Sequence, residues 1–120
     1  MPEPKAAMDD FLLINLLFIV AGVIFMLLAI PLILQKVPPN QWYGFRTTKT
    51  LSDETIWYAV NKLMGYDLLA VGAAIVASGV SLLLAGRALT LVQTLWINLG
   101  VLGTALLLGL IHGLLALRDY

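Results

Sequence analysis

The sequence predicts an all-α membrane protein with three transmembrane helices and one amphipathic interfacial helix between the first and the second. Of its 120 residues, 61% are hydrophobic and only 12% are charged, whereas about one quarter of a soluble domain is charged. The apolar residues form long runs, separated by a single long polar interval at residues 40–57. A small domain leaves much of its surface exposed, so this apolar excess is expected to face lipid. We treat residues 1–120 as one domain.

Composition also excludes several classes of protein. The formal net charge is zero, so no basic field favours nucleic acid. With no cysteine and a single histidine, neither a metal site nor a cofactor is predicted. The sequence contains no GxSxG, HExxH or phosphate-loop motif. This absence argues against enzymatic activity without excluding it.

The first span is predicted at about residues 11–34, because about 20 apolar residues cross a hydrocarbon core. A cleaved signal peptide is the alternative, but it needs a basic start and a shorter apolar core. This chain instead carries Asp9 and Asp10 before a long apolar run, which favours a retained helix. Pro31 lies near its end, and the polar, proline-containing residues 35–39 terminate it.

An interfacial helix is predicted at about residues 53–64. Thr50 and Asp53 fit the Ser/Thr-x-x-Asp/Glu pattern that opens helices, with Ser52 as a rival cap. Apolar residues then recur at helical spacing along one side, with polar residues opposite. Such a segment is suited to lying in the plane of the interface.

The second span is predicted at about residues 66–86 and the third at about 89–117. Gly65, Gly72, Gly79 and Gly86 follow one another at a spacing of seven. This spacing keeps them on nearly one helix face, where small residues allow another helix to approach closely. The face can serve packing within the chain or self-association into a homo-oligomer.

Basic residues predict the orientation, since they favour the cytoplasmic side. The side of the polar interval and the C-terminus carries five of them, and the opposite side carries two. We therefore expect the polar interval and the C-terminus in the cytoplasm and the N-terminus outside. The five are Lys36, Arg46, Lys49, Lys62 and Arg118, and the two are Lys5 and Arg87.

The polar interval offers two interpretations. Arg46 and Lys49 precede a helix start and would suit an anion such as a lipid phosphate or a carboxylate. The hydroxyls that accompany them are those of Thr47, Thr48, Thr50 and Ser52. Alternatively, Arg46 pairs internally with Asp53 or Glu54, and the hydroxyls only cap the helix. The sequence leaves both open.

Two further groups of side chains stand out. Trp57, Asn61 and Gly65 lie one turn apart, either as a binding face or as an anchor, a hydrogen bond and a helix junction. Asn15, Asn98 and His112 are isolated in the apolar runs and form a predicted intramembrane polar cluster. A proton or ligand role for His112 is the alternative.

The polar interval resembles the signature of the SdpI family of bacterial membrane proteins. That family is named for members giving immunity to a secreted peptide toxin, the sporulation-delaying killing factor. Larger members carry additional transmembrane helices, so this chain resembles a short three-helix form. The motif reads GFRT at 44–47 and TLSD at 50–53, followed by a tryptophan, an asparagine and a glycine. The predicted ligand-binding or signature residues are Tyr43, Gly44, Arg46, Thr47, Lys49, Thr50, Ser52, Asp53, Trp57, Asn61 and Gly65.

The resemblance implies a multi-pass protein of the bacterial cytoplasmic membrane, of the immunity or signalling type. It would protect against a peptide toxin, or relay the toxin's presence through the polar interval. Because a cytoplasmic loop cannot meet an external toxin directly, the expected contact is a cytosolic regulatory protein, an anionic lipid headgroup or a small ligand. The alternative is a membrane-embedded enzyme acting on a lipid or amphipathic substrate at the interface.

Overall fold

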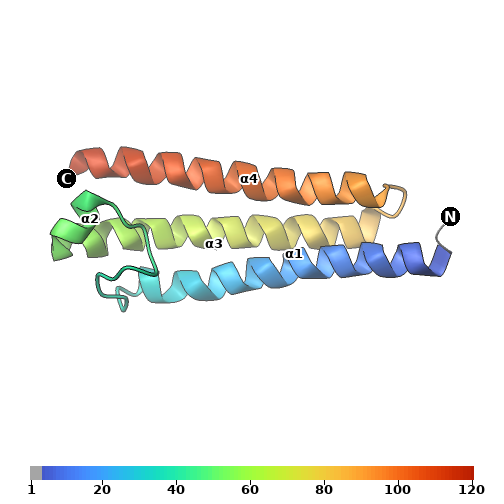
Figure 1. Cartoon of the computed structure of the whole chain (residues 1–120), viewed down its shortest axis with the longest axis horizontal. Helices are drawn as coiled ribbons and strands as arrows, with labels where there is room; N and C mark the ends of the chain where they lie inside the picture. The colour runs from blue at the N-terminus through green and yellow to red at the C-terminus, as the bar shows by residue number, and fades with distance from the viewer. Residues whose placement is uncertain (1–3) are drawn as a thin grey trace.

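The computed structural model describes residues 4–120 as three long helices, one short helix and a terminal 3-10 turn. In chain order these are α1 (Pro4–Ile33), α2 (Thr48–Ser52), α3 (Glu54–Ala85), α4 (Leu91–Ala116) and η1 (Leu117–Asp119). The long helices run side by side in a bundle of 57 × 23 × 21 Å. Figure 1 shows α2 and the C-terminus at one end of the bundle, and the start of α1 at the other.

The predicted fold class is confirmed. Three helices are long and apolar enough to cross a membrane, and a short helix lies between the first two. That short helix is α2, however, and residues 54–64 belong to α3. They follow the long axis of the bundle instead of lying across it (Figure 1).

Packing explains why residues 54–64 continue into the second span. Gly65 lies within α3 and lets α1 pack closely against it, because an added Cβ there would come within 3.0 Å of the Ile33 backbone nitrogen. One face of the segment, with Trp57, Val60 and Asn61, is buried in the protein. The resulting helix has 32 residues, or about 48 Å, and exceeds a hydrocarbon core of roughly 30 Å.

The helix caps also differ from the predicted Thr50–Asp53 pair. Asp53 caps α3 by accepting hydrogen bonds from the backbone N–H groups of Thr55 (2.7 Å) and Ile56 (3.3 Å). Thr47 caps α2 in a reciprocal capping box: its Oγ1 accepts from the Thr50 N–H, and its own N–H donates to Thr50 Oγ1. Each helix therefore has its own cap, which allows the chain to turn between them at Asp53.

The glycines of α3 bring α1 into close contact. An added Cβ at Gly72 would lie 2.6 Å from the Gly22 carbonyl oxygen, and one at Gly79 would lie 3.1 Å from that of Asn15. Gly65 also faces α1, so three of the four glycines that follow one another at a spacing of seven face this helix. The fourth, Gly86, ends α3. Within this chain, α1 occupies the glycine face.

Helix α4 is attached far more loosely. Across the described residues, its buried positions are Thr94, Asn98 and Gly113. An added Cβ at Gly100 or Gly103 would meet nothing within 4 Å among them. The helix begins with a capping box between Thr90 and Gln93. Most of its apolar surface is therefore left for lipid or another partner.

Candidate functional site

Residues 34–53, which connect α1 to α3 and include α2, cover one end of the bundle. We call this segment the polar cap. The first half folds around Asn40, whose Oδ1 accepts hydrogen bonds from the N–H groups of Trp42 (2.8 Å) and Tyr43 (2.7 Å). Its Nδ2 donates to the carbonyl oxygens of Pro38 (2.8 Å) and Tyr43 (3.1 Å). An asparagine side chain that bonds nearby backbone in this way fixes a turn.

Gly44 and Trp57 form the contact between the polar cap and α3. Gly44 has φ +116°, and an added Cβ would lie 2.8 Å from Asn61 Oδ1 and 3.1 Å from Trp57 Cη2. Both the backbone conformation and the space therefore require glycine. Trp57 is fully buried, and its Nε1 donates to the Val37 carbonyl at 2.8 Å. The buried indole therefore contacts the loop at both Val37 and Gly44 and supports it from the side of α3.

The backbone of Phe45 is held on both sides. Its N–H donates to Asn61 Oδ1, and its carbonyl accepts from Thr50 Oγ1 at 3.0 Å and from Asn61 Nδ2 at 3.4 Å. Asn61 Nδ2 also donates to the Trp57 carbonyl at 3.0 Å. Asn61 and Thr50 are buried, so these bonds replace water. Both residues fasten the loop to the helices.

The side chains of Arg46 and Lys49 in the polar cap contact backbone carbonyl groups. Arg46 Nη1 donates to the Gln41 carbonyl, and Lys49 Nζ donates to the Leu117 carbonyl at 2.8 Å. Asp53 is used as a cap, and within residues 4–120 the ion pair present is Asp67–His112. The structure therefore brings Arg46 to neither Asp53 nor Glu54.

The hydroxyl groups and Tyr43 are placed as follows. Ser52 Oγ donates to the Lys49 carbonyl at 2.7 Å, while Thr47 and Thr50 bond each other. The helix-start N–H groups proposed for an anion are thus occupied by Thr47 and Asp53. The Tyr43 hydroxyl is buried without a hydrogen-bond partner among the described residues. Burial raises the pKa of this phenol.

Two of the three predicted intramembrane polar residues meet. Asn98 Nδ2 donates to Asn15 Oδ1 at 3.0 Å, linking α4 to α1. Ser78 Oγ of α3 donates to Asn98 Oδ1 at 2.9 Å, so all three helices share the network. Asn15 Nδ2 in turn donates to the Phe11 carbonyl at 3.0 Å. Each buried amide thus has partners, as lipid-embedded polar groups require.

His112 lies elsewhere, beside Asp67 of α3. Its Nδ1 is 2.6 Å from Asp67 Oδ2, and the two side chains are 49% and 24% exposed. It shares nearly one helix face with Asn98, but about 21 Å of helix axis separates the two. That length keeps His112 out of the Asn15–Asn98 network.

The family match covers nearly all of the polar cap, the whole of α3 and most of α4. Residues 36–113 match the SdpI/YfhL protein family, and this range is more than half of the chain. The chain belongs to the SdpI/YfhL family. Neither the curated proteins nor the solved structures contain a match. The match spans the loop, Trp57, Asn61 and the Asp67–His112 pair, so this SdpI/YfhL unit contains both sites described above.

The chemistry available in this SdpI/YfhL unit is hydrogen bonding and charge. In the described part of the chain, no three His, Asp or Glu side chains gather as metal ligands. Asp67 engages one imidazole nitrogen of His112 and leaves Nε2 as a base or a donor. The polar cap exposes Arg46 and Trp42, the latter 87% exposed. These groups suit recognition of another molecule.

Three residues that the site depends on were missed from sequence. Asn40 directs the first half of the loop, and the Pro-Pro-Asn run before two aromatic residues was its signal. Neither Asp67 nor Ser78 was predicted to belong to a site. Their partners lie in α4, so no local pattern could identify them.

Proposed function

We propose that this SdpI/YfhL protein is a membrane protein of the immunity or signalling type, and that the polar cap is its recognition element. It protects a bacterial cytoplasmic membrane against a secreted peptide toxin, or relays the toxin's presence to a cytosolic regulatory protein. The family match over residues 36–113 carries the proposal, because it includes the whole second half of the loop and its supports.

The construction of the polar cap supports a recognition role. The side chains of Asn40, Asn61 and Thr50 form hydrogen bonds with the loop backbone, and these bonds hold the loop in one conformation. Trp42 and Arg46 remain on the surface of that fixed loop. A rigid loop loses little conformational entropy on binding, which favours affinity for a partner.

The proposed orientation places the polar cap and the C-terminus in the cytoplasm and the N-terminus outside. The basic residues Lys36, Arg46 and Lys49 at this end support it. Lys49 contacts Leu117, so the cap and the C-terminus share one side in either orientation. A reporter enzyme fused after Tyr120 tests the assignment, and activity only on the outer side would contradict it.

The central test is survival of a toxin-sensitive bacterium that expresses the protein. We expect protection relative to an empty vector, and its loss in Arg46→Ala, which removes an exposed cation from the cap. Arg87→Ala is the matched control, because it removes an exposed cation at the opposite end of the bundle. Equal killing with and without the protein would rule out immunity for the toxin used.

The Asp67–His112 pair supports a second candidate, a membrane-embedded enzyme acting on a lipid or amphipathic substrate. A carboxylate that fixes an imidazole leaves the other nitrogen poised as a general base. Turnover of membrane lipids that requires the protein, and that disappears in His112→Gln, is the expected result. Unchanged lipid composition with and without the protein would remove this candidate.

A further inference from the structure

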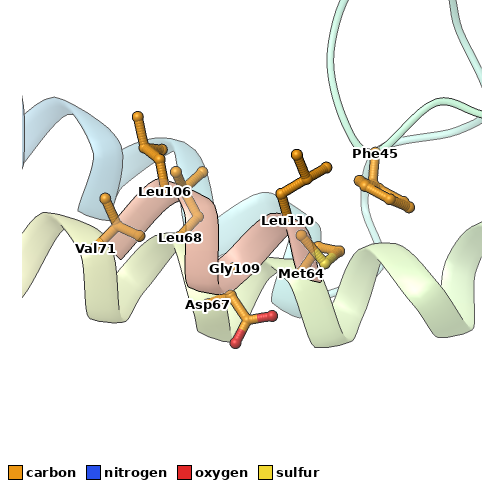
Figure 2. A pocket seen from close by; sticks show the side chains of 8 residues that line it. All are labelled: Phe45, Met64, Asp67, Leu68, Val71, Leu106, Gly109 and Leu110. Atoms are coloured by element: carbon orange, nitrogen blue, oxygen red, sulfur yellow. The ribbon is translucent and has the colours of Figure 1, made fainter. Parts of the chain in front are cut away.

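An apolar pocket lies between α3 and α4, directly beneath the polar cap. It exists because Gly109 supplies no side chain, and an added Cβ there would have Asp67 Cβ as its neighbour at 3.7 Å. Figure 2 shows the Asp67 carboxylate directed away from Leu106 and Leu110, so the pocket interior is hydrocarbon. The lining residues are Phe45, Met64, Asp67, Leu68, Val71, Leu106, Gly109 and Leu110.

The position of this pocket along α4 places it within the bilayer. Trp96, near the start of α4, is 68% exposed, and such tryptophans favour the headgroup level. Leu110 lies about 21 Å further along the helix axis. With a hydrocarbon core of roughly 30 Å, the pocket opens into acyl chains just below the headgroup level on the side of the polar cap.

A fixed positive charge lies above the pocket. Leu117 is two turns beyond Leu110 on the same face of the C-terminal segment, a rise of about 10 Å. Lys49 Nζ is 2.8 Å from the Leu117 carbonyl and is exposed. An ammonium group has three N–H donors, so two remain for another acceptor. The polar zone of a bilayer is about 5–8 Å deep on each side, which places Lys49 among the headgroups.

We propose that the α3–α4 pocket holds an acyl chain of one anionic phospholipid, whose phosphate binds Lys49. A phospholipid supplies in one molecule both the apolar chain and the negative charge, separated as the pocket and Lys49 are. Basic residues beside a pocket between transmembrane helices recognise anionic lipids in this way. A second copy of the chain is the competing occupant, and the experiment below distinguishes it from a lipid.

The lipid would also act on the polar cap. Phe45 lines the pocket, and its backbone is held by Asn61 and Thr50. An occupied pocket fixes the ring of Phe45 from below, while an empty pocket leaves it without that support. Lipid binding is therefore a direct input to the recognition loop, although the binding itself does not depend on the proposed immunity role.

Native mass spectrometry of the full chain, released from detergent with equal amounts of phosphatidylglycerol and phosphatidylcholine, tests the proposal. We expect one retained phosphatidylglycerol on the wild type, and about tenfold less on Gly109→Leu, whose side chain fills the pocket. Gly103→Leu is the matched control, since it makes the same change on the same helix outside the pocket. Leu106→Trp is a second filling variant, should Gly109→Leu fail to fold.

Lys49→Gln tests the headgroup contact separately. We expect it to retain lipid but to lose several-fold in the preference for phosphatidylglycerol, because the phosphate loses its cation. Equal lipid retention by Gly109→Leu and Gly103→Leu would overturn the pocket assignment. A dimer that disappears in Gly109→Leu, with no bound lipid in the wild type, would identify a second copy as the occupant and overturn the proposal as well.

Discussion

Helices α1 and α4 pack against the same helix, α3, in opposite ways. The α1–α3 contact is made by shape: backbone approaches backbone at Gly22 and Gly72, closer than any side chain would allow. The α4 contact includes polar links from Asn98 to Ser78 and from His112 to Asp67, with the open glycines Gly100 and Gly103 between them. The α1–α3 interface is therefore close-packed along its length, whereas the α3–α4 interface has its polar links on either side of an open stretch.

This difference shows what holds helices together in lipid. Lipid tails are as apolar as leucine, so burying apolar side chains does not by itself favour helix association. Close van der Waals packing and hydrogen bonds remain, and the two interfaces each rely mainly on one of them. The α3–α4 interface also contains the pocket beside Gly109, which the tighter α1–α3 packing could not accommodate.

The largest effect is expected from Gly72→Leu, which tests packing by shape. Its Cβ alone would come within 2.6 Å of the Gly22 carbonyl oxygen, so α1 must move away. We expect a loss of about 3 kcal/mol in the free energy of unfolding. Titration of the detergent-solubilised protein with SDS, followed by circular dichroism, measures it.

Gly100→Leu is the control for that prediction. Its side chain enters open space, so the free energy of unfolding should change by less than about 0.5 kcal/mol. Similar losses in the free energy of unfolding for Gly72→Leu and Gly100→Leu would mean that the α1–α3 contact does not depend on its glycines.

A smaller effect is expected from Asn98→Leu, which tests the polar attachment of α4. It removes the hydrogen bonds to Asn15 and Ser78, and we expect a loss of about 1 kcal/mol in the same titration. Thr94→Val is the control one turn away, because the buried Thr94 hydroxyl finds no partner within residues 8–120. Stability should hold or rise slightly there. A larger loss for Thr94→Val than for Asn98→Leu would contradict the assignment.

The smallest effect is expected from Asp67→Asn, at the other attachment of α4. Both members of the Asp67–His112 pair are partly exposed, so solvent and salt weaken their attraction. We expect a loss of about 0.5 kcal/mol or less in the free energy of unfolding. Asp119→Asn, an exposed carboxylate near the same end, provides the baseline. A loss above that of Asn98→Leu would make this pair the principal attachment.

The sequence predicted the spans and the packing face well, because both are local patterns. Hydropathy identifies an apolar run, and the spacing of Gly65, Gly72 and Gly79 identifies a helix face, without knowledge of the partner. The meeting of Asn15 with Asn98 was also expected, since isolated amides in lipid need partners.

The parts that sequence reasoning missed depend on contacts far apart in the chain. Residues 54–64 appeared to be a surface helix, because Trp57 and Asn61 looked as suited to the interface as to the protein interior. Their burial is caused by the loop folding back through Val37 and Phe45. The pairing of His112 with Asp67 likewise depends on the relative axial position of α3 and α4, which no local spacing encodes.

Helix α3 is continuous from the membrane-spanning part to the residues that hold the loop, so a tilt of one part would move the other. The helix exceeds the hydrocarbon core by about 18 Å, and Trp57 and Asn61, the supports of the loop, lie near its start. A tilt of about 10° inside the membrane would displace its outer end by about 3 Å. A change in the bilayer that tilts α3 would therefore also move Arg46 and Trp42, because Trp57 and Asn61 of α3 hold the loop that carries them.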